Sequence, residues 1–198
     1  MDVFEAIQAR RSIRLFKQEP IPEDTMIKLI AAARCAPSAA NRQPLEFIIV
    51  TDKKLNNNVF EQLGWAAYVR PKRNPPADKR PVAYIIVIIN KHRALAKFAP
   101  VDAAAAIENI LLAAQALGLG ACWIGSVNRE KLGSIIDLTD DYQIDSVIAL
   151  GYPDEKPLME DCKTNSIEYY LDENGRLHVP KRPLSSVIHI NKYGMNSA

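Results

Sequence analysis

The pattern of apolar positions is clearest in two stretches near the middle of the chain. Residues 82–89 show no polar alternation, so they predict a central strand that is covered on both faces. Residues 100–117 predict a helix in which Ile107 and Ile110 belong to one apolar face, while alanines make the other faces nearly apolar as well. Such a helix is buried all round, either in the core or in a subunit interface. In a chain of 198 residues, this two-sided burial favours a dimer.

Shorter patterns place the remaining elements around the central strand. β-Branched and aromatic residues predict a second strand over residues 46–51. A strand covered on both faces requires helices on both sides of the sheet, and we expect one domain over residues 1–198. Further strands are expected over residues 121–124 and 146–150, and further helices over residues 2–9, from Glu23 to near Pro37, over residues 52–65 and over residues 129–138.

Two segments lack this periodicity. Residues 70–81 contain four prolines and five bases, and a long loop of this kind is either a lid over a site or a solvated surface loop. From residue 159 to residue 198 the sequence shows no packed core. We therefore expect a C-terminal arm that lies over the body or over a partner subunit.

Composition excludes several classes of protein. The 25 Lys and Arg residues against 23 Asp and Glu leave a net charge of +2, which favours neither nucleic acid nor a membrane surface as a partner. There is no secretory signal pattern and no membrane-length apolar run, so we expect a soluble cytoplasmic protein. Cys35, Cys122 and Cys162 are widely separated, which fits a reducing compartment and predicts no metal site. We interpret Cys35 and Cys122 as small core residues.

Glycines between the predicted helix and strand invite comparison with a dinucleotide fingerprint. That fingerprint runs strand, then glycines, then helix, so that the pyrophosphate meets the helix N-terminus. Here Gly118 and Gly120 follow a helix and precede a strand, and Gly125 comes too late in the chain to be the third glycine of the fingerprint. The sequence therefore disfavours a Rossmann site, and it contains no P-loop.

Two polar clusters are candidate ligand sites. Residues 10–14 read Arg-Arg-Ser-Ile-Arg, and guanidinium groups with a hydroxyl are suited to phosphate oxygens. The alternative is that these arginines pair on the surface with acids such as Glu5 or Glu19. Residues 36–44 form a small, polar loop before a strand, where a planar ligand can approach the backbone. Taken alone, that loop is equally an ordinary turn.

Taken together, the motifs have the order and spacing of a known family. Arg-Arg-Ser-Ile-Arg at residues 10–14, Pro-Ser-Ala-Ala-Asn-Arg-Gln-Pro at 37–44 and Gly-Leu-Gly-Ala-Cys-Trp-Ile-Gly at 118–125 resemble the FMN-dependent nitroreductases. The resemblance extends to Leu-Gly-Tyr-Pro at residues 150–153 and Lys-Arg-Pro-Leu at 181–184, so it covers most of the chain. Each motif is weak singly, but the ordered set is specific.

The resemblance implies an α+β fold with three layers, in which helices flank a mixed central sheet. It also implies a segment-exchanged homodimer with FMN at the subunit interface. NADH or NADPH donates electrons to the flavin, and a nitroaromatic, a quinone or a similar small molecule accepts them. No catalytic side chain is implied, because the chemistry belongs to FMN. His92, His178 and His189 are accordingly interpreted as surface or packing residues.

The resemblance also implies a set of FMN-binding residues. It places Arg10, Arg11 and Ser12 at the phosphate and ribityl chain. It also places Arg14 near the pyrimidine edge of the flavin ring, where a cation stabilises the reduced form. Trp123 contributes its backbone, although its ring is equally well interpreted as a core aromatic. The family commonly has Ser-Ser where this chain has Ser-Ala at residues 38–39, so one hydrogen bond to FMN is expected to be missing. The full set is Arg10, Arg11, Ser12, Arg14, Trp123, Ile124, Gly125, Lys181 and Arg182 from one subunit, and Pro37, Ser38, Ala39, Asn41 and Gln43 from the other.

Two other functions remain open from the sequence. One is a specialised member of the same superfamily that dehalogenates an aromatic substrate or breaks down its own flavin. The other is a non-catalytic flavin-binding protein. The five bases of residues 70–81 suggest a further hypothesis, namely that this loop attracts the phosphates of NADPH.

Overall fold

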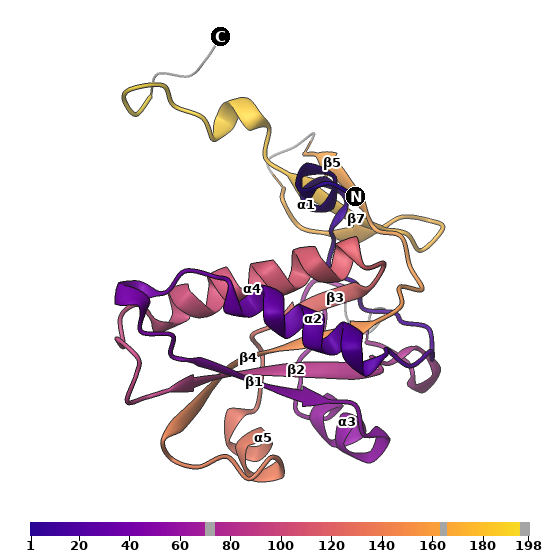
Figure 1. The fold of residues 1–198 in the computed structure, drawn as a ribbon. Helices are drawn as coiled ribbons and strands as arrows, with labels where there is room; N and C mark the ends of the chain where they lie inside the picture. The colour runs from indigo at the N-terminus through magenta and orange to yellow at the C-terminus, as the bar shows by residue number, and fades with distance from the viewer. Residues whose placement is uncertain (70–73, 163–165, 195–198) are drawn as a thin grey trace.

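A four-stranded antiparallel sheet forms the centre of the protein in the computed structural model, which describes residues 1–69, 74–162 and 166–194 (Figure 1). Its strand order is β1-β2-β4-β3. As predicted, β2 is central, and its residues are buried apart from Asn90 at its end. The strands are β1 (Leu45–Val50), β2 (Ala83–Asn90), β3 (Gly120–Ile124) and β4 (Tyr142–Gly151).

Helices cover both faces of this sheet. Figure 1 shows α2 (Glu23–Arg34) and α4 (Ala99–Ala116) on one side, and α3 (Lys53–Phe60) and α5 (Arg129–Ile135) on the other. Successive side chains of β2 point to opposite faces of the sheet. Ile85 packs against α2 and α4, whereas Ile86 packs against α3 and α5. The predicted three-layer α-β-α architecture is therefore confirmed.

Several predicted boundaries differ from the structure, and three of them have a clear physical reason. The helix predicted over residues 52–65 ends at Phe60, because the Gly64 N–H donates to the backbone oxygen of Ser126 (2.8 Å) instead of continuing the helix. The helix predicted over residues 129–138 ends at Ile135, shortly before Asp137 turns to a φ of 51°. The strand predicted over residues 146–150 begins earlier, at Tyr142, since its polar first half also pairs with β2.

The two cysteines interpreted as core residues have different surroundings. Cys122 on β3 is 4% exposed, as predicted. Cys35 is exposed, so its interpretation as a core residue was wrong. It immediately follows the last residue of α2, where the chain leaves the packed face of that helix. Residues 70–73 of the basic loop lie outside the described residues, and the remainder includes the short helix η2 (Ala77–Lys79).

The N-terminal helix leaves its apolar face exposed in a single chain. Helix α1 (Val3–Ala9) is capped by Asp2, which exchanges hydrogen bonds with Glu5 in a capping box. Its side chains Phe4 and Ile7 are nevertheless 72% and 49% exposed. Helix α4 likewise buries one side, while Val101 remains 62% exposed. Apolar surface of this kind is typical of regions that contact another chain.

The C-terminal part contains a second, smaller sheet. Its order is β5-β7-β6, with β5 (Leu158–Asp161) parallel to β7 (Leu177–Lys181), and β6 (Tyr170–Leu171) antiparallel to β7. Leu177, the first residue of β7, is buried. Beyond this sheet, the short helix η3 (Leu184–Ser186) and residues 187–194 extend away from the body, in yellow in Figure 1.

A histidine between two carboxylates holds the small sheet together. His178 on β7 contacts Glu160 of β5 through Nδ1 (3.0 Å) and Asp172 of the β6–β7 connection through Nε2 (3.3 Å). The ring of Tyr170 stacks on the imidazole, with 4.8 Å between ring centroids, and its hydroxyl donates to Glu160. The cluster joins β5, β6 and β7, so His178 is a packing residue of the small sheet, as the sequence predicted.

The His178 cluster predicts a pH dependence of stability. Its hydrogen bond with Glu160 raises the pKa of His178 above the ordinary 6.5, so the stabilisation is complete below that pH and is lost as pH rises through the raised pKa. The hydrogen bond from the backbone N–H of Arg176 is the main cause that lowers the pKa of Asp172 below its ordinary value of 3.8. The stabilisation that Asp172 contributes is therefore lost only in acid, as the pH falls below that value.

Thermal unfolding measures this effect. Between about pH 6 and pH 9, the Tm of the wild type should fall more than that of the His178→Gln variant, which has no titrating ring. Equal falls in the two proteins would show that the imidazolium does not stabilise the sheet.

Candidate functional site

The arginine cluster belongs to a segment that crosses one end of the central sheet. The Ile13 N–H donates to the backbone oxygen of Ala121 on β3 (2.9 Å), and the Lys17 N–H donates to the oxygen of Tyr152, just after β4 (2.9 Å). Phe16, between them, is fully buried. Backbone bonds at both ends and a buried aromatic in the middle hold the segment in one position against β3 and β4.

Two glycines make room for this segment. Gly120 on β3 and Gly151 on β4 face each other in the register of the sheet. A Cβ on Gly120 would lie 2.8 Å from Cγ2 of Ile13, and one on Gly151 would lie 2.8 Å from Cδ1 of Phe16. Any larger residue would therefore displace the segment. The Gly-Leu-Gly and Leu-Gly-Tyr-Pro motifs thus contribute to the site by allowing the arginine segment to pack closely against β3 and β4.

The first two arginines of the cluster have different partners. The Nε of Arg10 lies 3.5 Å from Oε1 of Glu108 on α4, and not beside Glu5 or Glu19. Glu108 is 47% exposed, and an ion pair of this kind is weak enough to leave the cation available to an anion. Arg11 instead donates to the oxygens of Gln8 (2.6 Å) and Arg10 at the end of α1. Burial and the neighbouring Arg10 lower the pKa of Arg11, which reflects a concentrated positive charge.

Arg14 is held at its backbone and at its side chain. The carboxylate of Glu155 accepts hydrogen bonds from the backbone N–H groups of Arg14 (2.5 Å) and Leu15 (3.1 Å). The guanidinium carbon lies 5.2 Å from the ring centroid of Tyr169. Sequence reasoning missed both partners. The only available signal was that Glu155 is the second of two acids that follow the Leu-Gly-Tyr-Pro motif.

The edge of β3 offers backbone groups next to the arginine segment. The Ala121 oxygen points outward to Ile13, and residues of a strand alternate in direction, so the N–H and C=O of Trp123 also point away from β4. They lie about 7 Å further along the strand. The ring of Trp123 is 41% exposed and donates to the hydroxyl of Ser146 (2.8 Å), so it is not a core aromatic.

Cys122 lies directly beneath the cluster. Its pKa is raised by burial, although Arg14 nearby acts in the opposite direction. The side chain of Ser12 forms a hydrogen bond with the thiol. A protonated, buried thiol is unreactive, which fits a packing role beneath Ser12.

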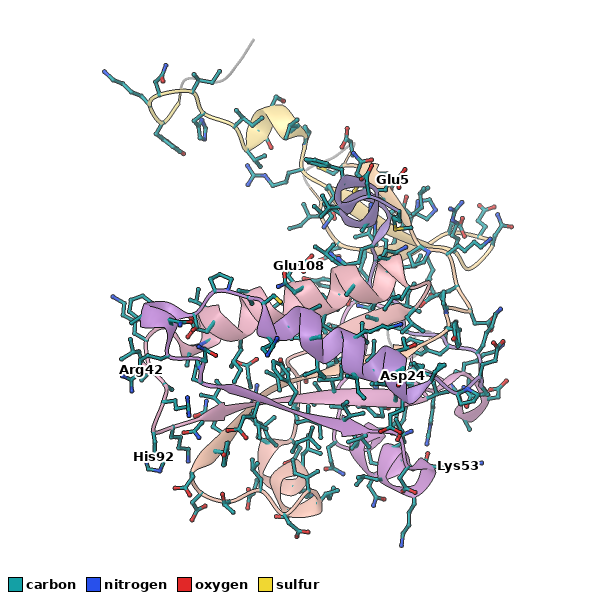
Figure 2. All side chains as sticks on the ribbon, viewed as in Figure 1. Glu5, Asp24, Arg42, Lys53, His92 and Glu108 are labelled. Atoms are coloured by element: carbon teal, nitrogen blue, oxygen red, sulfur yellow. The ribbon has the colours of Figure 1, made fainter. Side chains whose placement is uncertain are left out.

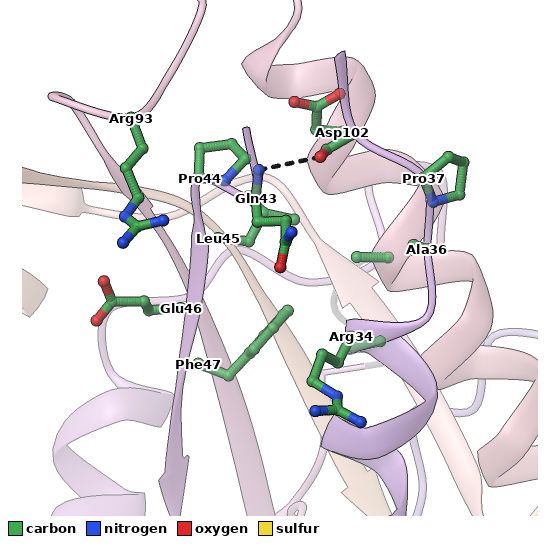
Figure 3. Close-up of a pocket in the computed structure, with 13 residues that line it drawn as sticks. Arg34, Ala36, Pro37, Gln43, Pro44, Leu45, Glu46, Phe47, Arg93 and Asp102 are labelled. Atoms are coloured by element: carbon green, nitrogen blue, oxygen red, sulfur yellow. Dashed lines mark hydrogen bonds between the residues drawn. The ribbon is translucent and has the colours of Figure 1, made fainter. Parts of the chain in front are cut away.

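The second predicted cluster forms a strained loop at the start of α4. Ser38 closes the loop by accepting the N–H of Gln43 (3.0 Å), the bond dashed in Figure 3. The N–H of Ala39 donates to the carboxylate of Asp102, which is 5% exposed. Asn41 and Gln43 have φ of 50° and 47°, a left-handed conformation unusual outside glycine. Such strain is concentrated at functional sites.

A cavity of about 230 Å³ lies beside this loop. Ser38 and Gln43 line it together with Phe47 and two arginines, Arg34 and Arg93 (Figure 3). Pro37, from the predicted set, lies at its edge. Glu46 and Asp102 line it too, so the cavity combines an aromatic ring and a hydroxyl with charges of both signs.

One chain does not bring the predicted residues into a single site. Arg42, beside the strained loop, and Glu5 of α1 lie on opposite sides of the molecule in Figure 2. Lys181 ends β7, and its oxygen accepts the N–H of Cys162 (2.8 Å). Arg182 donates to the oxygen of Ser186 (2.8 Å) within the C-terminal segment. The chain thus presents its arginine segment and its strained loop as two separate surfaces.

Two further properties of the described residues bear on function. Across residues 1–69, 74–162 and 166–194, His, Cys, Asp and Glu side chains form no group of three or more suited to a metal ion. Within the same ranges, no helix combines the length and apolarity needed to cross a membrane.

Known proteins share both the sequence and the fold of this chain. The family model of the nitroreductase family matches residues 7–152, and the chain belongs to that family. A relative from Methanothermobacter thermautotrophicus, described as a candidate NADH dehydrogenase/NAD(P)H nitroreductase, is 35% identical over 161 residues, which are 79% of this chain and 80% of the relative.

Solved structures support the same assignment. A protein from Parabacteroides distasonis with the same description is 32% identical and has a TM-score of 0.69, with 82% of this chain and 93% of that chain covered. A candidate nitroreductase from Desulfovibrio desulfuricans, solved in complex with FMN, is 24% identical with a TM-score of 0.70 and 95% of each chain covered. The second likeness concerns the fold alone.

Proposed function

We propose that this protein is an FMN-dependent NAD(P)H oxidoreductase that reduces nitroaromatic, quinone or similar small-molecule acceptors. The observation that carries the proposal is the arginine segment seated beside the outward-directed backbone of Trp123. FMN, when bound, supplies the redox chemistry by accepting hydride at N5 from a nicotinamide and passing the electrons to the acceptor. The nicotinamide and nitroreductase descriptions of the relatives support this reading.

The phosphate end of FMN is assigned to the exposed side of the arginine segment. Arg10 has only a weak surface partner, and Ser12 adds a hydroxyl beside it. Lys181 and Arg182 are assigned to the same phosphate, because they form a basic stretch at the end of β7. Arg11 is expected to contribute mainly long-range charge, since its donors serve the end of α1.

The ring end of FMN is assigned to Arg14 and to the edge of β3. Arg14 offers N–H donors to the pyrimidine edge, where negative charge collects on reduction. The outward backbone of Trp123 offers hydrogen bonds to the reactive part of the ring, and Ile124 and Gly125, which follow it along the chain, are assigned to the same region. None of these groups has to transfer a proton, which is why no catalytic side chain is assigned.

A homodimer completes the proposed site. The strained loop with Pro37, Ser38, Ala39, Asn41 and Gln43 lies apart from the arginines of its own chain, so a second chain would supply it. Exposed apolar side chains on α1 and in the C-terminal segment, such as Phe4 and Leu184, give that second chain a surface to cover. The proposal places this dimer in the cytoplasm, with small molecules and not nucleic acid or membrane as partners.

Anaerobic reduction tests the proposed activity. The FMN-loaded protein is mixed with NADH or with NADPH, and loss of the oxidised flavin absorbance is followed. At least one donor should bleach the flavin, and a nitroaromatic or a quinone should then restore its absorbance. If neither donor bleaches bound FMN, the oxidoreductase proposal is overturned in favour of a non-catalytic flavin-binding protein.

A further inference from the structure

Arg14 is fixed more firmly than an ordinary surface arginine. Its backbone N–H donates to Glu155, and the same carboxylate oxygen accepts the N–H of Leu15. Its guanidinium lies over the ring of Tyr169 at 5.2 Å from the centroid, within the range of a cation–π contact. Two residues distant in sequence, one before and one after β5, therefore converge on a single arginine.

Tyr169 is itself anchored on both sides. Its ring packs edge-on against Tyr68, with 5.0 Å between centroids, and its hydroxyl accepts a long hydrogen bond from the Tyr68 N–H (3.4 Å). The adjacent Tyr170 stacks on His178 and donates to Glu160 within the small sheet. The small sheet thus holds Tyr169 over the arginine segment of the central body.

The geometry of a guanidinium makes this arrangement useful. Its N–H donors lie in the plane of the group, whereas an aromatic ring contacts its face. Stacking on Tyr169 therefore restricts the orientation of Arg14 without using its donors. Glu155 restricts Arg14 by accepting the backbone N–H of Arg14, which leaves the guanidinium of Arg14 charged and available.

We propose that Tyr169 and Glu155 are positioning residues that hold the guanidinium of Arg14 with its N–H edge toward the flavin. This inference rests on the proposed function, because it assumes that Arg14 meets the pyrimidine edge of FMN. A correctly oriented cation favours the reduced, negatively charged flavin over the oxidised one. The two residues therefore tune the preference of the protein for reduced FMN.

The test compares the affinities of each variant for oxidised and for reduced FMN. Arg14→Met should remove the preference for the reduced form. Tyr169→Leu should lower affinity for reduced FMN about 2- to 5-fold more than affinity for oxidised FMN, the size expected of one exposed cation–π contact. Tyr169→Phe keeps the ring and should behave as the wild type. In the Arg14→Met background, Tyr169→Leu should have no further effect on the ratio.

Glu155 is tested in the same way. Glu155→Gln retains an acceptor oxygen for the two N–H groups and should keep most of the preference, whereas Glu155→Leu should lose it. Equal changes in both affinities on Tyr169→Leu, or no change while Arg14→Met removes the preference, would overturn the positioning role and leave the proposed function intact. A wild-type protein that binds no FMN would instead overturn the proposed function itself.

Discussion

Replacing Arg10 and Arg182 together by alanine is expected to weaken FMN binding about 100- to 10,000-fold. Each arginine is assigned a charge-assisted hydrogen bond to the phosphate, and such a bond contributes about 1.5–3 kcal/mol. Fluorescence titration of the apoprotein with FMN measures the loss. Riboflavin, which lacks the phosphate, should bind the variant and the wild type almost equally.

Two control variants separate a specific phosphate contact from general charge. Lys53→Ala removes one positive charge from the exposed start of α3, which lies well apart from Glu108, the partner of Arg10, in Figure 2, and this variant should leave FMN affinity unchanged. Arg11→Ala should weaken binding less than Arg10→Ala, since Arg11 donates to the carbonyls of α1. Unchanged FMN affinity in the double variant would contradict the phosphate assignment.

The second large effect is expected at Gly120. In Gly120→Ala the new methyl group would meet the side chain of Ile13 at 2.8 Å, so the arginine segment must shift. Overpacking of this kind costs about 1–3 kcal/mol of unfolding free energy. FMN affinity should fall as well, because Ser12 and Arg14 flank the displaced residue. Denaturant unfolding and FMN titration measure the two effects.

Gly133→Ala is the matched control for this substitution. Gly133 lies in α5, and an added Cβ would come no closer than 4.0 Å to Leu138. Alanine within a helix is favoured over glycine by about 0.5–1 kcal/mol, so this variant should be as stable as the wild type or more stable. If Gly120→Ala behaves like Gly133→Ala, the seat proposed for the arginine segment is wrong.

The layers of the fold were predictable because burial leaves a clear pattern in sequence. The apolar residues of β2 and the apolar face of α4 that contains Ile107 and Ile110 correspond directly to buried contacts. Helix ends were less predictable, since they depend on distant partners. The last predicted turn of α3 is replaced by a hydrogen bond from the Gly64 N–H to the oxygen of Ser126, a partner that lies far away in the sequence.

The candidate site was predictable only where residue chemistry is distinctive. Guanidinium groups and a hydroxyl within five residues are chemically suited to an anion, so this cluster could be selected from the sequence as a candidate site. By contrast, Asp102, Glu155 and Tyr169 act by contacts that fold topology creates, across tens of residues of sequence. An isolated acid or tyrosine carries no such signal, so their roles emerge only from three-dimensional packing.

The most direct test of the central claim is the absorbance spectrum of the purified protein after reconstitution with FMN and removal of unbound flavin. The arginine segment, the edge of β3 and the strained loop together predict stoichiometric FMN with flavin bands altered by the protein. A spectrum without flavin bands would contradict the account.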